Sequence, residues 1–266
     1  MKTTSKLQSL PDKTFIITLN LTQDQIKSEY QQVLKSVQSD FETKGFRKGK
    51  VPLEIVKEQI SEDEILKEVA SHLISDAYTA FIKDKNLHPI IQPQIKILNA
   101  PISLDKDWQV EITSCELPPL VLDPKYQDEV KKINKLPPSE TTIDQIFNEL
   151  LKLTSVTLPP ILVESDINNR LSQLIDQTQE AGITINQYLK NKNQTLDSYK
   201  KSLSDQITKE WTLNLIIDQI AKDQKIEVDP KDAQMLIQKS PQLKDNPNLV
   251  YYLIQQQKVV DYLKKL

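Results

Sequence analysis

This chain has only three glycines in 266 residues, and two of them lie four residues apart in one basic segment. Glycine adopts positive φ and allows close backbone approach, so the segment is expected to form a tight loop. Three cations, Arg47, Lys48 and Lys50, stand beside Phe46, a combination that suits a phosphate-rich or acidic partner. An ordinary solvated loop is the alternative, because glycine and lysine are common loop residues. The segment reads Gly45-Phe46-Arg47-Lys48-Gly49-Lys50-Val51-Pro52.

A nucleotide-binding P-loop is excluded at this segment. That motif needs four residues between its glycines and a hydroxyl residue directly after its lysine. Here three residues separate Gly45 from Gly49, and Val51 follows Lys50.

The first part of the chain mixes two hydrophobic periods, which predicts an α+β domain. Apolar residues alternate over 15–21, as expected for a strand with one buried face. Thr22 and Gln25 form a capping box that begins an amphipathic helix, which ends near Phe41. The other elements expected here are a helix from Pro52, a long helix over 61–86, and strands over 94–98 and 108–115.

Prolines mark the boundary with the second half. A proline has no backbone N–H and favours an extended conformation in the residue before it. Three such prolines occur close together here, in Leu117-Pro118-Pro119 and Asp123-Pro124. Beyond them the apolar period is helical throughout. We therefore expect an α+β domain at 1–118, a linker at 119–137 and an all-α domain at 138–266.

Composition limits the classes of partner. With 38% hydrophobic and 27% charged residues, the chain falls among ordinary globular proteins. A net charge of −3 argues against a general nucleic-acid binder, so affinity for RNA must come from a local patch such as Lys44 to Lys50. Neither a secretory signal nor an apolar run of ~20 residues is present. A cytoplasmic location without a membrane partner is expected.

Residues for catalysis or metal binding are scarce. Cys115 is the only cysteine, which excludes an intramolecular disulfide and a cysteine-based metal cluster. His72 and His88 are the only histidines, and no nucleophile–base pair stands out. We expect no enzyme activity, no metal and no cofactor.

The glycine segment resembles the ribosome-binding signature of trigger factor, the bacterial chaperone that meets nascent chains at the exit tunnel. The family pattern is G-F-R-x-G-x-x-P, and residues 45–52 match every fixed position. The second half resembles the family's C-terminal helical domain at Leu158-Pro159-Pro160-Ile161-Leu162-Val163-Glu164 and from Ala181-Gly182-Ile183-Thr184 to Tyr188-Leu189-Lys190. Together the two likenesses cover nearly the whole chain.

One departure from the family stands out. Trigger factor usually carries a peptidyl-prolyl isomerase domain between these halves, whereas only about 126–157 lies between them here. A typical domain has ~100 residues. The resemblance therefore implies a form of the chaperone without its isomerase domain.

The resemblance implies an ATP-independent chaperone that docks at the ribosome exit tunnel and shields nascent or unfolded polypeptides. Arg47 and Lys48 would contact acidic protein or rRNA phosphate, Phe46 would fill an apolar niche, and Gly45 and Gly49 would set the shape of the loop. The ribosome-binding residues implied in this way are Gly45, Phe46, Arg47, Lys48, Gly49, Lys50 and Pro52.

Two alternatives stay open. The same loop would suit an RNA-binding module, although few aromatic residues and an acidic net charge argue against a broad RNA surface. The chain would also suit a ribosome-associated assembly or interaction protein whose helices hold one fixed partner. Affinity for unrelated unfolded proteins separates this last alternative from a chaperone.

Overall fold

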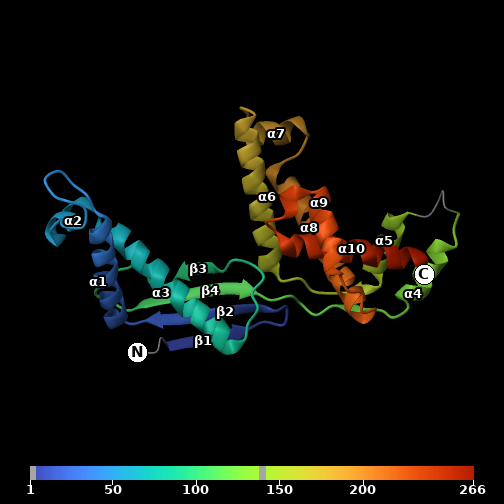
Figure 1. Ribbon diagram of the computed structural model, residues 1–266, viewed down its shortest axis with the longest axis horizontal. Helices are drawn as coiled ribbons and strands as arrows, with labels where there is room; N and C mark the ends of the chain where they lie inside the picture. Colours follow the sequence, from blue (N-terminus) through green and yellow to red (C-terminus); the bar gives the residue numbers. More distant parts are fainter. Residues whose placement is uncertain (1–3, 138–141) are drawn as a thin grey trace. The chain divides into compact units, whose positions relative to one another are not determined.

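The computed structural model describes residues 4–137 and 142–266 (Figure 1). Its contacts divide the chain into two units, Met1–Leu117 and Pro118–Leu266, here called unit 1 and unit 2. The expected start of the helical domain, at 138, lies outside the described residues. Within the described ranges, no helix is both long and apolar enough to cross a bilayer.

Unit 1 is built on a four-stranded antiparallel sheet with the order β1-β2-β4-β3. The two central strands pair over eight residues, from Thr14 opposite Cys115 to Leu21 opposite Trp108. Both alternate buried and partly exposed residues, so one face of the sheet is apolar. The strands are β1 Thr4–Ser9, β2 Thr14–Leu21, β3 Gln94–Ile97 and β4 Trp108–Cys115.

In the described part of unit 1, three helices accompany the sheet, and local capping explains where the two longer ones begin. The Thr22 side chain accepts a hydrogen bond from the Gln25 amide, and Ser61 does the same for Glu64. The long helix ends at Asn86, which adopts the left-handed conformation. The helices are α1 Gln23–Asp40, α2 Leu53–Gln59 and α3 Glu62–Lys85.

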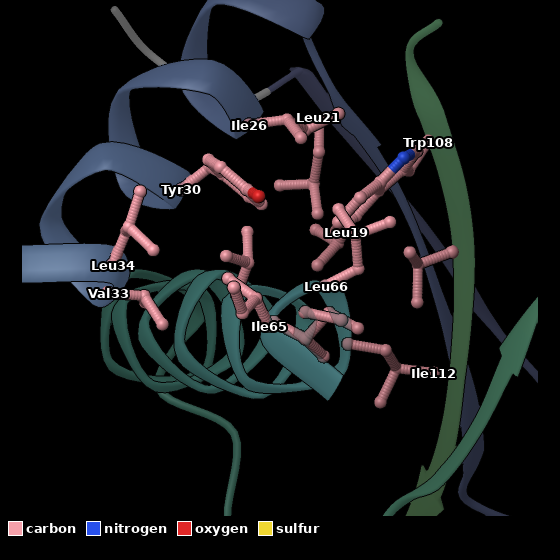
Figure 2. Packing of buried hydrophobic residues seen from close by; sticks show 14 of the residues in the cluster. Leu19, Leu21, Ile26, Tyr30, Val33, Leu34, Ile65, Leu66, Trp108 and Ile112 are labelled. Atoms are coloured by element: carbon pink, nitrogen blue, oxygen red, sulfur yellow. The ribbon is translucent and has the colours of Figure 1, made fainter. Parts of the chain in front are cut away.

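The core of unit 1 lies between the apolar face of the sheet and the helices α1 and α3 (Figure 2). Trp108 is fully buried, and its indole N–H donates to the Ser103 carbonyl at 2.8 Å. Figure 2 shows side chains from α1, α3 and the strands pointing into one cluster: Leu19, Leu21, Ile26, Tyr30, Val33, Leu34, Ile65, Leu66, Trp108 and Ile112. This core fixes α1, which precedes the glycine loop, and also buries Val56 of α2, which follows the loop.

Unit 2 is mainly helical, as expected, but it also contains a short antiparallel pair. The strands β5 Val121–Leu122 and β6 Thr154–Ser155 pair through two residues each, so the second half is not entirely helix. The helices are α4 Tyr126–Asn134, α5 Ile143–Lys152, α6 Pro160–Glu180, α7 Ile185–Asn191, α8 Leu196–Asp223, α9 Pro230–Lys239, η1 Pro241–Leu243 and α10 Pro247–Lys265.

The segment 119–137, expected to be a linker, instead holds β5 and α4. Tyr126 and Val130 lie one turn apart on α4, and both are buried in the main core of unit 2. The prolines that suggested a linker precede this helix and do not interrupt it. The segment is therefore part of the folded body of unit 2.

Among the described residues of unit 2, two clusters of buried side chains share α8. The larger core joins α4, α5, the C-terminal half of α8 and α10. The smaller core contains Leu171 of α6 with Leu203 and Ile207 from the N-terminal half of α8. Across it, the indole N–H of Trp211 donates to the Asp166 carboxylate at 2.8 Å, and Arg170 pairs with Glu210. The helices α6, α7 and α8 thus form an arm on the larger body.

Candidate functional site

The glycine segment forms a tight connection between α1 and α2, and both of its glycines have positive φ. Gly45 has φ +89° and Gly49 has φ +74°, values that L-residues with a Cβ rarely adopt. The Phe46 amide donates to the Thr43 carbonyl, and the Gly49 amide donates to the Phe41 carbonyl, each at 3.1 Å. These bonds turn the chain twice within nine residues.

The end of the loop is anchored in the core of unit 1. Val51 is fully buried, and its carbonyl accepts a hydrogen bond from the Gln38 side chain at 2.7 Å. Pro52 takes the N-cap position, so α2 begins at Leu53, one residue later than the sequence predicted. Gln59 of α2 donates to the Thr43 hydroxyl at 3.4 Å. The tip of the loop is therefore presented from a fixed base.

The predicted contact residues are exposed at this tip. The Phe46 side chain is 39% exposed, unusual for a phenylalanine in a folded domain. Arg47 and Lys50 are also exposed, and neither has a carboxylate within ion-pair distance among the described residues. An exposed aromatic ring and unpaired cations therefore lie together on one loop.

Lys48 differs from its neighbours because it has a partner within unit 1. Its Nζ lies 2.9 Å from the Asp40 carboxylate at the end of α1. The hydrogen bond and charge of Asp40 raise the pKa of Lys48 above its ordinary value. Because Asp40 partly neutralises this charge, Arg47 is the less compensated cation of the pair that the sequence put forward.

A second candidate surface lies in unit 2, where α5, α9 and α10 enclose a groove of about 690 Å³. Apolar side chains from all three helices line it, including Phe147, Leu236 and Ile254. An ion pair between Lys258 and Asp232, 2.8 Å long, lies at its edge. Sequence reasoning missed this groove, because its walls come from segments about 90 residues apart. The only signal was the broad apolar surface of α10.

The residues that could serve catalysis or metal binding have local contacts that explain them without such a role. His72 lies 3.1 Å from the Glu29 carboxylate, on the exposed sides of α3 and α1. Burial raises the pKa of Cys115 to about 11, so its thiol is protonated and unreactive at neutral pH. Among the described residues, no group of three His, Cys, Asp or Glu side chains is arranged to hold a metal ion.

Two family models match this sequence. The model of the bacterial trigger factor protein matches residues 1–153, and the model of its C-terminus matches residues 122–266. The two matches overlap at 122–153, so no stretch between them is left for a further domain.

Curated relatives match a shorter stretch. Trigger factors from Streptococcus pneumoniae strains JJA and 70585 are 33% identical to this chain over 95 residues. That stretch is 36% of this chain and spans only 22% of the length of either relative.

A solved structure resembles nearly the whole fold. It is a trigger factor chaperone, reported for promiscuous substrate recognition in folding and assembly activities. It matches with a TM-score of 0.67 and covers 98% of this chain and 99% of its own. Sequence identity is 11%, so this likeness concerns the fold alone.

Proposed function

Because the chain belongs to the bacterial trigger factor family, we propose that it is an ATP-independent chaperone that docks on the ribosome and covers unfolded polypeptide. The chain lacks the region of the peptidyl-prolyl isomerase domain, so the proposal rests on its two remaining parts. Unit 1 provides the docking loop, and unit 2 provides the surface for client chains. The observation that carries the proposal is the exposed loop tip on a fixed base.

Ribosome docking is assigned to the loop tip. Phe46 offers an exposed apolar surface, while Arg47 and Lys50 carry charges that acidic protein or rRNA phosphate can pair with. Gly45 and Gly49 hold the turns, and buried Val51 with Pro52 ties the loop to α2. A preformed loop loses little conformational entropy on binding, which favours affinity.

Client binding is assigned to the apolar groove of α5, α9 and α10. A groove of about 690 Å³ accepts several apolar side chains. Such contacts are non-directional and scale with apolar area, which suits reversible binding of unrelated segments. ATP independence is proposed because the glycine loop does not have the P-loop pattern.

Co-sedimentation with ribosomes tests the docking loop. Replacing Phe46, Arg47 and Lys48 together by alanine leaves both glycines in place, so unit 1 should stay folded. The loss of charged contacts worth ~1.5–3 kcal/mol each predicts at least a tenfold weaker Kd. Lys67→Ala with Lys83→Ala removes two exposed charges from α3 and serves as the control. Undiminished binding by the triple variant would remove the loop from the mechanism.

Aggregation of a chemically unfolded client tests the groove. Leu236→Gln places a polar group in its lining and should weaken suppression of aggregation without ATP, while ribosome binding stays unchanged. Ile175→Gln, at an exposed position on α6, is the matched control. Ribosome binding without any suppression of aggregation would favour an interaction protein with one fixed partner instead of a chaperone.

A further inference from the structure

A second hollow of unit 2 lies against a different side of α10 from the apolar groove. Its volume is about 640 Å³. Asn248, Tyr251, Tyr252 and Gln255 line it from α10, and their spacing of three and four residues places them on one stripe of that helix. The opposite wall comes from Asp218 of α8 and from the segment 226–228 after it.

The charged residues that line this hollow are both acidic. Asp218 is half-buried, and among the described residues its carboxylate has no hydrogen bond or ion pair. Glu227 is exposed at the rim. Lys222, one turn along α8, influences Asp218 at longer range but does not line the hollow. A partly buried carboxylate without a partner is unfavourable, and a cation in the hollow would relieve that cost.

Two tyrosines supply the other feature of the hollow. The Tyr252 hydroxyl donates to the Asn214 side chain, so it is not available to Asp218. Tyr252 and Asp218 line the same hollow, and burial and the charge of Asp218 raise the pKa of Tyr252. Tyr251 is 43% exposed. Tyrosine rings attract ammonium and guanidinium groups through their negative faces.

We propose that this hollow is a subsite for a basic side chain, arginine or lysine, of a polypeptide bound to unit 2. Asp218 pairs with the cation, and the tyrosines cover its apolar stem and contact its charge. The subsite deepens the proposed chaperone function and rests on it. It adds selectivity by charge to binding that would otherwise depend on apolar area alone.

Fluorescence anisotropy with the full chain tests the subsite. The probe is the labelled peptide Leu-Ser-Leu-Ala-Arg-Ala-Leu-Ser-Leu, and the comparison peptide carries citrulline in place of arginine. Citrulline has nearly the same shape but no charge, so the ratio of the two Kd values isolates the cation. We expect the arginine peptide to bind about fivefold more tightly, the size of a partly exposed charge pair.

Asp218→Asn should reduce this preference to less than about twofold, while Asp205→Asn, an exposed carboxylate elsewhere on α8, should leave it unchanged. Tyr251→Leu keeps an apolar side chain and should weaken the preference by about twofold. Because Tyr251 is exposed, this variant tests the subsite independently of the change at Asp218. Added salt should lower the preference in the unaltered protein.

The outcomes distinguish this subsite from the chaperone assignment. Equal binding of both peptides by the unaltered protein overturns the subsite and leaves the chaperone assignment in place. If both Asp218→Asn and Tyr251→Leu keep the preference for the arginine peptide, the proposed subsite is also overturned, because another part of the protein then binds the arginine. If neither peptide binds at micromolar concentration, the proposed client binding fails together with the subsite.

Discussion

The two glycines of the docking loop allow a controlled comparison, because both have positive φ but the space around them differs. A Cβ at Gly49 would lie 3.0 Å from the Ser39 carbonyl oxygen, which belongs to the backbone of α1. A Cβ at Gly45 would meet no atom within 4 Å. Both residues have positive φ, so Gly49→Ala and Gly45→Ala share the conformational penalty and differ in the steric one.

The shared penalty for placing an L-residue in the left-handed region is ~1–2 kcal/mol. At Gly49 the methyl group must also push the loop away from α1. That shift weakens the bond from the Gly49 amide to the Phe41 carbonyl, which is worth ~1 kcal/mol. We expect Gly45→Ala to destabilise unit 1 by about 1–2 kcal/mol and Gly49→Ala by about 1 kcal/mol more.

Urea unfolding followed by tryptophan fluorescence measures this difference. The chain has two tryptophans, Trp108 in unit 1 and Trp211 in unit 2. A Trp211→Phe background leaves Trp108, which is fully buried, as the single reporter of unit 1. Both alanine variants are compared in that background. Equal losses of unfolding free energy for the two variants, within about 0.5 kcal/mol, would refute the steric argument at Gly49.

Three further predictions concern unit 2, the first part of the chain and catalysis. Burial raises the pKa of the Asp218 carboxyl above its ordinary value of 3.8, so the folded state binds this carboxyl proton more tightly than the unfolded state does. The stability that this proton contributes is lost as the pH rises through the folded pKa. Asp218→Asn should therefore raise the urea midpoint of unit 2 at pH 7, and the gain should vanish below pH 3.8; an equal gain at both pH values would contradict this. A fragment of residues 1–118 should fold alone and bind ribosomes, which circular dichroism and co-sedimentation can check. Proline isomerisation in a short peptide should proceed at its uncatalysed rate, over tens to hundreds of seconds, because the isomerase region is missing; acceleration by the protein would contradict this.

The sequence predicted helices and strands that bury side chains at a regular spacing, and it missed a strand that is held mainly by backbone hydrogen bonds. The alternation over 15–21 predicted β2, and the capping boxes predicted the starts of α1 and α3. The strand β1 was missed because Leu7 is its one apolar residue, and that side chain is only partly buried. Its pairing with β2, from Thr4 opposite Asn20 to Ser9 opposite Phe15, holds it in place. Backbone pairing of this kind leaves little pattern in the side chains.

The same distinction applies to the candidate site. The glycines and the basic residues of the loop were visible in the sequence, because each acts locally. The ion pair between Lys48 and Asp40 was not, because it depends on the path of the loop back to the end of α1. The helix α4 was missed because its two buried residues, Tyr126 and Val130, are too few for a helical period to stand out from a proline-rich segment.

The shared helix α8 joins two cores of unequal size, and this has a consequence for local opening. Its C-terminal half contributes Ile216, Ile217 and Ile220 to the larger core, whereas its N-terminal half is buried by little more than Leu203 and Ile207. Opening free energies follow local burial. Amide hydrogens should therefore exchange with solvent faster near Leu203 than near Ile216, so that protection rises along one continuous helix. The part of unit 2 formed by α6, α7 and the N-terminal half of α8 should therefore open more readily than the larger core.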